Sequence, residues 1–218
     1  MEFYNLIFEK VKKNLKNLDK NTNLTNMTNN VIENAQNFID KNRDKTEFDL
    51  IACKSGCSDC CIVFITTLFP EALNIAEYLR KTKKEKSLIP LLEKRVLDTR
   101  WTDEEDWSLL GKKCIFLDEK GDCTIYPVRP LLCRAVTSVS VDDCKEAISG
   151  KIMGEERAVL MNLLTLKTYR QGFQGMSDAL NEYKLDSTGF EITRSVLYAL
   201  KHTDAEKQFI SGNTMRFF

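Results

Sequence analysis

The sequence Cys53-Lys-Ser-Gly-Cys57-Ser-Asp-Cys60-Cys61 holds four of the chain's eight cysteines. The other four follow in one later segment, at Cys114, Cys123, Cys133 and Cys144. Soft thiolate ligands suit zinc, copper(I) and iron–sulfur centres, so cysteines gathered in this way indicate a metal site. The sequence therefore predicts a protein that folds around a cysteine-ligated metal centre.

The spacing within the first group suggests more than one metal atom. Cys57 and Cys60 have the two-residue separation common to zinc knuckles and iron–sulfur loops, which brings two thiolates to one ion. Cys61 directly follows Cys60, and neighbouring side chains do not normally converge on one ion. The two cysteines either serve different metals or different irons, or one of them is a thiol beside the centre. Because a mononuclear zinc site needs only four ligands, the number of cysteines favours a polynuclear cluster with spare thiols or two sites.

Composition limits the function classes. The 218 residues are 43% hydrophobic and 29% charged, as in an ordinary globular protein. Lys plus Arg and Asp plus Glu balance at 32 each, so we expect neither nucleic acid nor a membrane as partner. An unidentified protein or small molecule is the expected partner.

The N-terminal residues lack the basic start, apolar block and small-residue cleavage site of a signal peptide, and no apolar run is long enough to span a bilayer. These features predict a cytoplasmic location. In a reducing cytosol, clustered cysteines are metal ligands or redox groups more often than disulfides. The even number of cysteines keeps a disulfide framework as an alternative.

Apolar residues recur at helical spacing over most of the chain. The predicted helices cover residues 3–18, 31–41, 70–79, 91–97, 102–110, 143–148, 155–169, 177–183, 192–200 and 205–210. The polar residues 21–30 are expected to form a loop or a helix break, because Asn and Thr side chains compete for backbone hydrogen bonds. Thr102 and Glu105 fit a capping box for the short helix that Gly111 ends.

Two short apolar runs flank a glycine-containing turn, which predicts one β-hairpin of residues 114–117 and 123–126. The expected fold is therefore mainly α, a helical domain with one small β-hairpin, organised around the cysteine-rich metal centre. Residues 1–50 are expected to form an N-terminal helical segment packed on the core. Residues 51–145 form the cysteine-cluster core, and residues 146–218 add C-terminal helices to the same domain.

The cysteine order continues into Gly121-x-Cys123-x-Ile125-Tyr126 and Arg129-Pro130-x-x-Cys133-Arg134. Together with the first group, these motifs resemble the bacterial family of CxxCxxCC-type zinc- or iron-chelating domains. The resemblance covers roughly residues 53–134, including Pro70-Glu71-Ala72, and it implies metal binding with zinc and iron both open. The spacing of three residues after Cys53, rather than two, departs from the family pattern. The expected ligands are Cys53, Cys57, Cys60, Cys61, Cys114, Cys123 and Cys133, with Cys144 as a further candidate.

An enzyme is the alternative. The cysteine pattern also resembles that of flagellin lysine methylases, which implies an S-adenosylmethionine-dependent methyl transfer or other iron–sulfur catalysis. The chain shows no Gly-rich strand-to-helix fingerprint for such a cofactor. The spacing Cys53-x3-Cys57-x2-Cys60 is also that of the radical S-adenosylmethionine loop, but Asp59 stands where those enzymes carry an aromatic residue. No catalytic residue is predicted.

Several further residues have two interpretations. Arg129 and Arg134 bracket Cys133 and either offset thiolate charge or form ordinary salt bridges. Glu71 lies in the first turn of a predicted helix, where an anion interacts favourably with the helix dipole, and this role is favoured over metal ligation. His202, the chain's one histidine, is not expected to be a ligand. Trp101 and Trp107 are expected in the core.

Overall fold

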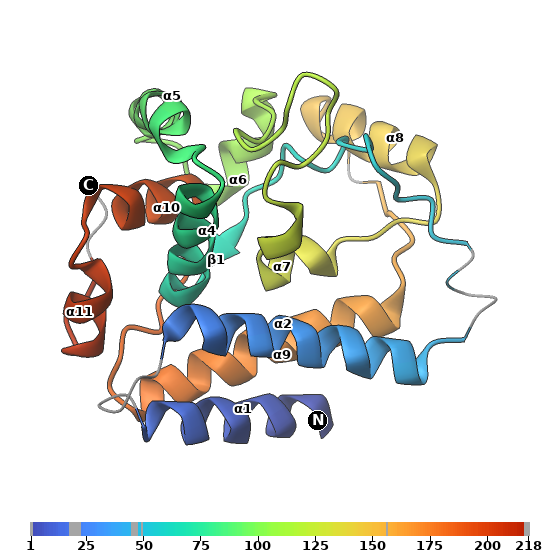
Figure 1. The fold of residues 1–218 in the computed structure, drawn as a ribbon. Helices are drawn as coiled ribbons and strands as arrows, with labels where there is room; N and C mark the ends of the chain where they lie inside the picture. The colour runs from blue at the N-terminus through green and yellow to red at the C-terminus, as the bar shows by residue number, and fades with distance from the viewer. Residues whose placement is uncertain (1, 18–22, 45–47, 49, 156, 216–218) are drawn as a thin grey trace.

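The computed structural model describes residues 2–17, 23–44, 48, 50–155 and 157–215, and helices dominate it. This confirms the predicted mainly α class (Figure 1). The described elements are α1 (Glu2–Leu15), α2 (Leu24–Asn42), β1 (Thr66–Thr67), α4 (Phe69–Lys81), α5 (Glu85–Asp98), α6 (Glu104–Trp107), η2 (Ser108–Leu110), η3 (Tyr126–Val128), α7 (Leu131–Ala135), α8 (Val141–Ile152), α9 (Leu163–Glu182), β2 (Phe190–Glu191), α10 (Ile192–Lys201) and α11 (Ala205–Ile210).

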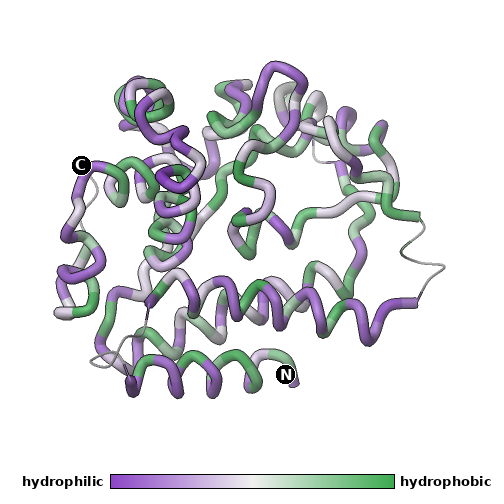
Figure 2. Tube along the Cα trace, viewed as in Figure 1, coloured by the Kyte–Doolittle hydropathy of each residue, from purple (hydrophilic) through white to green (hydrophobic). Residues whose placement is uncertain are grey.

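Helices α1, α2 and α9 pack together as one layer, in the lower part of Figure 1. Phe3, Ile7, Val11 and Leu15 recur every four residues on α1, and all four are buried. Hydrophobic and hydrophilic residues alternate along α1 and α2 in Figure 2, as expected for helices that bury one face. Leu18, the last apolar residue of the predicted first helix, lies outside the described residues.

Helix α2 begins earlier than predicted. Residues 24–30, expected as a loop or helix break, form its first turns. The side-chain oxygen of Asn23 accepts hydrogen bonds from the backbone N–H groups of Thr25 and Asn26, at 2.8 and 3.2 Å. Inside a helix, an asparagine side chain competes for the backbone hydrogen bonds. At the N-cap, the same side chain stabilises the helix. The polar run therefore starts the helix instead of breaking it.

Helix α9 is continuous, whereas two helices were predicted at residues 155–169 and 177–183. The stretch 157–162 is not helical, and Asn162 caps the helix by accepting a hydrogen bond from Thr165 N at 2.9 Å. The helix then runs through Gly172 and Gly175. A Cβ atom on Gly175 would lie 2.9 Å from the carbonyl oxygen of Tyr4. The glycine that weakens the local helix signal is what lets α1 and α9 approach closely.

Helix α4 packs on α2 and on α10, and α10 also packs on α5. The predicted start of α4 near Pro70 is confirmed, since the helix begins at Phe69. The short helix α6 is capped one residue later than predicted, because Asp103 and not Thr102 accepts the hydrogen bond from Asp106 N. Gly111, in the left-handed conformation with φ of 59°, follows η2 as expected.

The small sheet pairs β1 with β2 in antiparallel register, with Thr66 opposite Glu191 and Thr67 opposite Phe190. It therefore joins segments far apart in the sequence. At the predicted hairpin of residues 114–117 and 123–126, the pairing is a single antiparallel bridge between Leu117 and Cys123. The Asp118 carboxylate closes the turn by accepting hydrogen bonds from the N–H groups of residues 120 and 122. The predicted second strand does not extend beyond this bridge, because residues 124–125 form a turn and residues 126–128 form η3, which contains a proline.

Buried apolar side chains form one cluster that extends from α1 to α11. None of the helices in the described parts of the chain combines the length and apolar character needed to cross a bilayer.

Candidate metal centre

A cavity of about 530 Å³ lies between the cysteine-containing segments. The seven cysteines predicted as ligands all line it: Cys53, Cys57, Cys60, Cys61, Cys114, Cys123 and Cys133. Cys144, on α8, does not line this cavity. All eight cysteines are free thiols in the structure. Tertiary folding thus brings together two groups of thiols that are more than 50 residues apart in the chain.

Backbone contacts hold the two cysteine segments against each other. The N–H of Cys114 donates a hydrogen bond to the carbonyl oxygen of Cys61 at 2.6 Å. Gly56 and Gly121 both adopt positive φ, 79° and 82°, where glycine has no steric penalty. A Cβ atom on Gly121 would lie 3.3 Å from both the Gly56 carbonyl oxygen and the Ser58 hydroxyl oxygen. The two turns therefore pack backbone against backbone beside the cavity, which both glycines line.

The exposed residue Cys53 is hydrogen-bonded to the segment that precedes α8. Ser138 N donates a hydrogen bond to Cys53 Sγ at 3.2 Å, and Ala52 N donates to the Ser138 carbonyl oxygen at 2.8 Å. Burial raises the pKa of the Cys53 thiol, and the hydrogen bond from the backbone lowers it in part. The sulfur at the edge of the cavity is thus already a hydrogen-bond acceptor.

The inner thiols are neutral at physiological pH in the metal-free chain. Burial raises the pKa of Cys133 to about 11 and that of Cys114 to about 12. Burial also raises the pKa of Cys123. Thiols must lose their protons to ligate a metal, so binding at this site would release protons.

A side-chain hydrogen bond connects Cys60 and Cys61. The hydrogen bond from Cys61 lowers the pKa of Cys60, helped by the positive charge of Arg129. The same hydrogen bond, followed by burial, raises the pKa of Cys61. The pair therefore favours a thiolate at Cys60 and a thiol at Cys61.

The two arginines beside Cys133 have different roles in the structure. Arg134 donates hydrogen bonds to the carbonyl oxygens of Arg129, Tyr126 and Pro127, at 2.8, 3.2 and 2.8 Å. It thus holds the backbone turn that leads into α7. Arg129 lines the cavity, and its guanidinium carbon lies 4.4 Å from the centroid of the Tyr126 ring. Its buried Nε–H has no hydrogen-bond acceptor among the described residues.

The remaining wall of the cavity includes residues that the sequence did not single out. Glu191, Ile192 and Thr193, from the end of β2 and the start of α10, line it. The buried Glu191 carboxylate accepts hydrogen bonds from Thr193 Oγ1 at 2.8 Å and from Arg194 N at 3.1 Å. Burial raises the pKa of Glu191. Glu191 lies directly before the predicted helix of residues 192–200, and no local signal in the sequence connected it to the cysteines.

Glu71 has a structural role, as favoured from the sequence. Its buried carboxylate accepts hydrogen bonds from Leu68 N at 2.9 Å and from Leu131 N at 2.7 Å. Burial raises its pKa to about 7, and these two hydrogen bonds act in the opposite direction. Glu71 therefore connects the start of α4 to the start of α7, the helix that carries Cys133.

The histidine and one of the two tryptophans do not line the cavity. His202 follows α10, where its ring stacks on Tyr198 with 4.1 Å between centroids, and it does not line the cavity. Trp107 is buried and lines the cavity. Trp101 is 88% exposed, so its predicted core position is wrong. The Arg100 guanidinium carbon lies 5.5 Å from the Trp101 ring centroid, so a cation packs over this exposed ring.

The donor set fits a thiophilic metal. Seven sulfurs around one cavity match the ligand chemistry of zinc and of iron–sulfur clusters. The unpaired Arg129 Nε–H adds a cationic donor on the same wall. Among the described residues, no three His, Cys, Asp or Glu side chains are already arranged to hold an ion. Ligation at roughly 2.3 Å therefore requires the sulfurs to move closer together.

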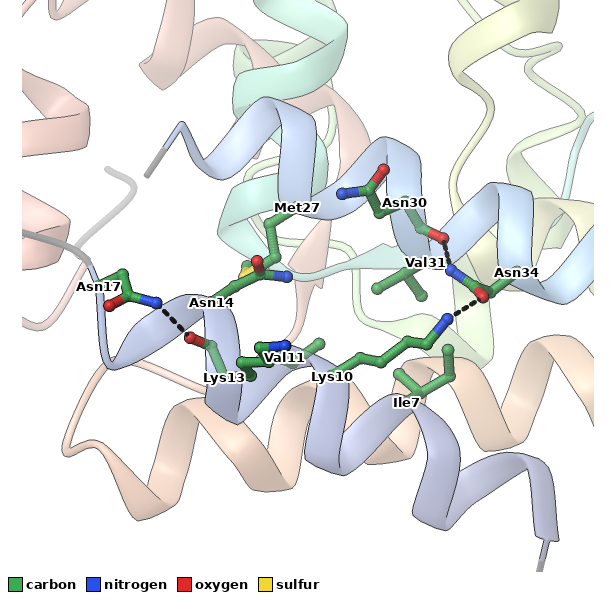
Figure 3. A pocket seen from close by; sticks show the side chains of 10 residues that line it. All are labelled: Ile7, Lys10, Val11, Lys13, Asn14, Asn17, Met27, Asn30, Val31 and Asn34. Carbon is green, nitrogen blue, oxygen red and sulfur yellow. Dashed lines mark hydrogen bonds between the residues drawn. The ribbon is translucent and has the colours of Figure 1, made fainter. Parts of the chain in front are cut away.

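A second hollow lies between α1 and α2 (Figure 3) and has a volume of about 370 Å³. Its lining is mostly asparagine, lysine and aliphatic side chains, and it contains no cysteine. Lys10 Nζ donates a hydrogen bond to Asn34 Oδ1 across it. This groove is separate from the thiols and offers no thiolate ligand.

Residues 52–155, just under half of the chain, match a family model named CxxCxxCC, with the description "Putative zinc- or iron-chelating domain". The match contains all eight cysteines and excludes α1, α2, α9 and the Glu191 wall of the cavity. No curated protein and no solved structure matches the chain.

Proposed function

We propose that this chain, which carries a CxxCxxCC domain over residues 52–155, binds iron or zinc through the thiols of the 530-Å³ cavity. The observation that carries the proposal is the convergence of seven cysteines from two distant segments on one cavity. That number exceeds the four ligands of one zinc ion. A polynuclear centre, an iron–sulfur cluster or a pair of ions, therefore accounts for the donor set better than a single ion.

The centre would cross-link the domain. Its ligands come from the loop of residues 53–61, from the turn region 114–123 and from α7. Metal binding in such a site contributes directly to folding free energy, because the unfolded chain does not present the ligands together. A cytoplasmic location and an unidentified protein or small-molecule partner remain predictions from the sequence.

Metal and sulfide analysis of protein purified without oxygen tests the proposal. Iron with acid-labile sulfide and absorbance near ~400 nm would identify an iron–sulfur cluster. Colourless protein with bound zinc would identify a zinc site. Protein that holds neither metal, and takes up neither during anaerobic reconstitution, would overturn the proposal.

Cysteine variants test the ligand set. We expect C57S and C60S to lose most of the bound metal and to melt at a lower temperature, because each removes a cavity thiol. C144S is the matched control, since it removes a thiol that does not line the cavity. Full metal content in both C57S and C60S would refute the assignment. So would equal loss in all three variants, because the cavity would then not distinguish ligands from other cysteines.

The cavity volume supports a second candidate function. About 530 Å³ lies within the usual range of small-molecule sites, so the centre has room for an organic ligand. An S-adenosylmethionine-dependent protein-lysine methylase, or another iron–sulfur enzyme, would use that space. The cofactor should then raise the melting temperature, because a ligand that binds only the native state stabilises it. No shift of the metal-loaded protein at millimolar cofactor would count against this alternative.

A further inference from the structure

Arg129 is held in place by its own backbone and by an aromatic ring. Its carbonyl oxygen accepts the Arg134 Nε–H at 2.8 Å, and its N–H donates to the Tyr126 carbonyl oxygen at 3.4 Å. The guanidinium lies over the Tyr126 ring, at 4.4 Å from the centroid. An arginine stacked in this way has lost much of its rotamer freedom before it meets any ligand.

The Arg129 side chain lines the cysteine cavity and carries a donor that no described protein group accepts. The Nε–H is buried without an acceptor among the described residues, which is unusual for a strong donor. Cys60, Cys123 and Cys133 line the same cavity as Arg129. The same cavity thus holds one fixed cation and candidate ligands from both cysteine-containing segments.

A nearby cation would offset the negative charge of a thiolate-ligated metal centre. A zinc ion with four thiolates carries a net charge of −2, and thiolate-ligated iron–sulfur clusters are also anionic. Hydrogen bonds to the sulfurs and nearby charge tune the affinity and the reduction potential of such centres. A planar guanidinium supplies both a positive charge and directed N–H donors.

We infer that Arg129 is a positioning residue of the metal centre, where its Nε–H donates a hydrogen bond to a metal-bound sulfur and its charge offsets that of the thiolates. This rests on the proposed metal-binding function. Arg134 does not supply such a donor, because its Nε–H and one terminal nitrogen donate to three carbonyl oxygens and the residue does not line the cavity.

The test compares R129Q and R129K with the parent protein loaded with the metal found in the purified protein. We expect R129Q to bind that metal about 10-fold or more weakly in competition with a chelator, as for other groups that hydrogen-bond to metal ligands. R129K keeps the charge but lacks the planar fork, so it should weaken binding by less. If the metal is iron, the reduction potential should fall in R129Q, because a lost positive charge disfavours the added electron.

R100Q is the matched control. It also removes an arginine stacked on an aromatic ring, at 5.5 Å from the Trp101 centroid, but at a position that does not line the cavity. We expect its metal affinity and potential to equal those of the parent protein. A loss in R100Q as large as that in R129Q would show a general effect of removing a surface charge and would overturn the inference.

The outcomes separate this inference from the proposed function. A parent protein that binds no metal refutes both. A parent protein that binds metal, with R129Q and R129K unchanged in affinity and potential, refutes only the role of Arg129. If R129Q does not fold, R129K decides: weaker binding at an unaltered circular dichroism spectrum supports the role, and unaltered binding overturns it.

Discussion

At Gly121 the two cysteine segments pack backbone against backbone. Its φ of 82° belongs to the left-handed region, and a Cβ atom there would crowd the Gly56 carbonyl oxygen at 3.3 Å. A side chain would therefore cause two separate penalties, one from the backbone conformation and one from the lost approach of the two turns. Only the second penalty changes the spacing of the thiols.

Gly111 allows these penalties to be separated. It also has positive φ, 59°, but nothing lies within 4 Å of a Cβ atom built on it. We expect G111A to lower the free energy of unfolding by about 1–2 kcal/mol, the cost of the left-handed conformation. G121A should cost about 1 kcal/mol more, because overpacking adds to the same conformational cost, and it should also reduce bound metal. Urea unfolding and metal analysis measure both effects. Equal stability and equal metal content in the two variants would mean that the Gly56–Gly121 contact does not set the cavity.

At the scale of elements, helix α9 contains two glycines that differ in their surroundings. A Cβ atom on Gly175 would lie 2.9 Å from the Tyr4 carbonyl oxygen, which is backbone and cannot rotate away. On Gly172 the nearest atom would be a side-chain carbon of Phe3 at 3.4 Å, an ordinary van der Waals contact. The packing of α1 on α9 therefore requires glycine at only one of the two positions.

The prediction compares G175A with G172A. We expect G175A to destabilise the protein by about 1–3 kcal/mol, the usual cost of overpacking a core. G172A should be neutral or stabilise by up to ~1 kcal/mol, because alanine is the better helix former. Thermal and urea unfolding of both variants check this. A G175A protein as stable as G172A would show that α1 shifts on α9 at no cost.

At the scale of the whole molecule, the structure combines a helical layer with a cavity built from turns. Helices α1, α2 and α9 pack on one another through buried apolar faces. The segments that carry most cavity cysteines are turns with few regular backbone hydrogen bonds. Regions of this kind open at lower free energy than packed helices.

Removal of the metal should therefore destabilise the cysteine-containing turns more than the helical layer. We expect chelation to increase amide hydrogen exchange most in residues 51–65 and 111–130, and least in α1 and α9. The reason is that the proposed metal would join the turns, whereas the helical layer is held by its own apolar contacts. Hydrogen exchange followed by mass spectrometry, with and without chelator, measures this. A uniform increase along the chain would show that the metal and the helical layer form one cooperative unit.

The sequence by itself determined the helical class and the pool of candidate ligands. Both depend on local information: apolar residues at helical spacing mark α1, α4, α10 and α11, and clustered cysteines mark a metal site wherever the chain places them. The polar run before α2 hid the cap at Asn23, although that contact is local. The division of α9 came from its glycines, because the close approach at Gly175 depends on a contact with the distant helix α1.

Only the tertiary structure decided which groups meet. It placed seven cysteines around one cavity without Cys144, and it paired Thr66 with Glu191 across more than 120 residues of chain. It also gave the two arginines different surroundings. Arg129 keeps an unpaired Nε–H, whereas Arg134 donates hydrogen bonds to backbone carbonyl oxygens. These outcomes follow from packing between segments far apart in the sequence, and no local pattern of residues encodes such contacts.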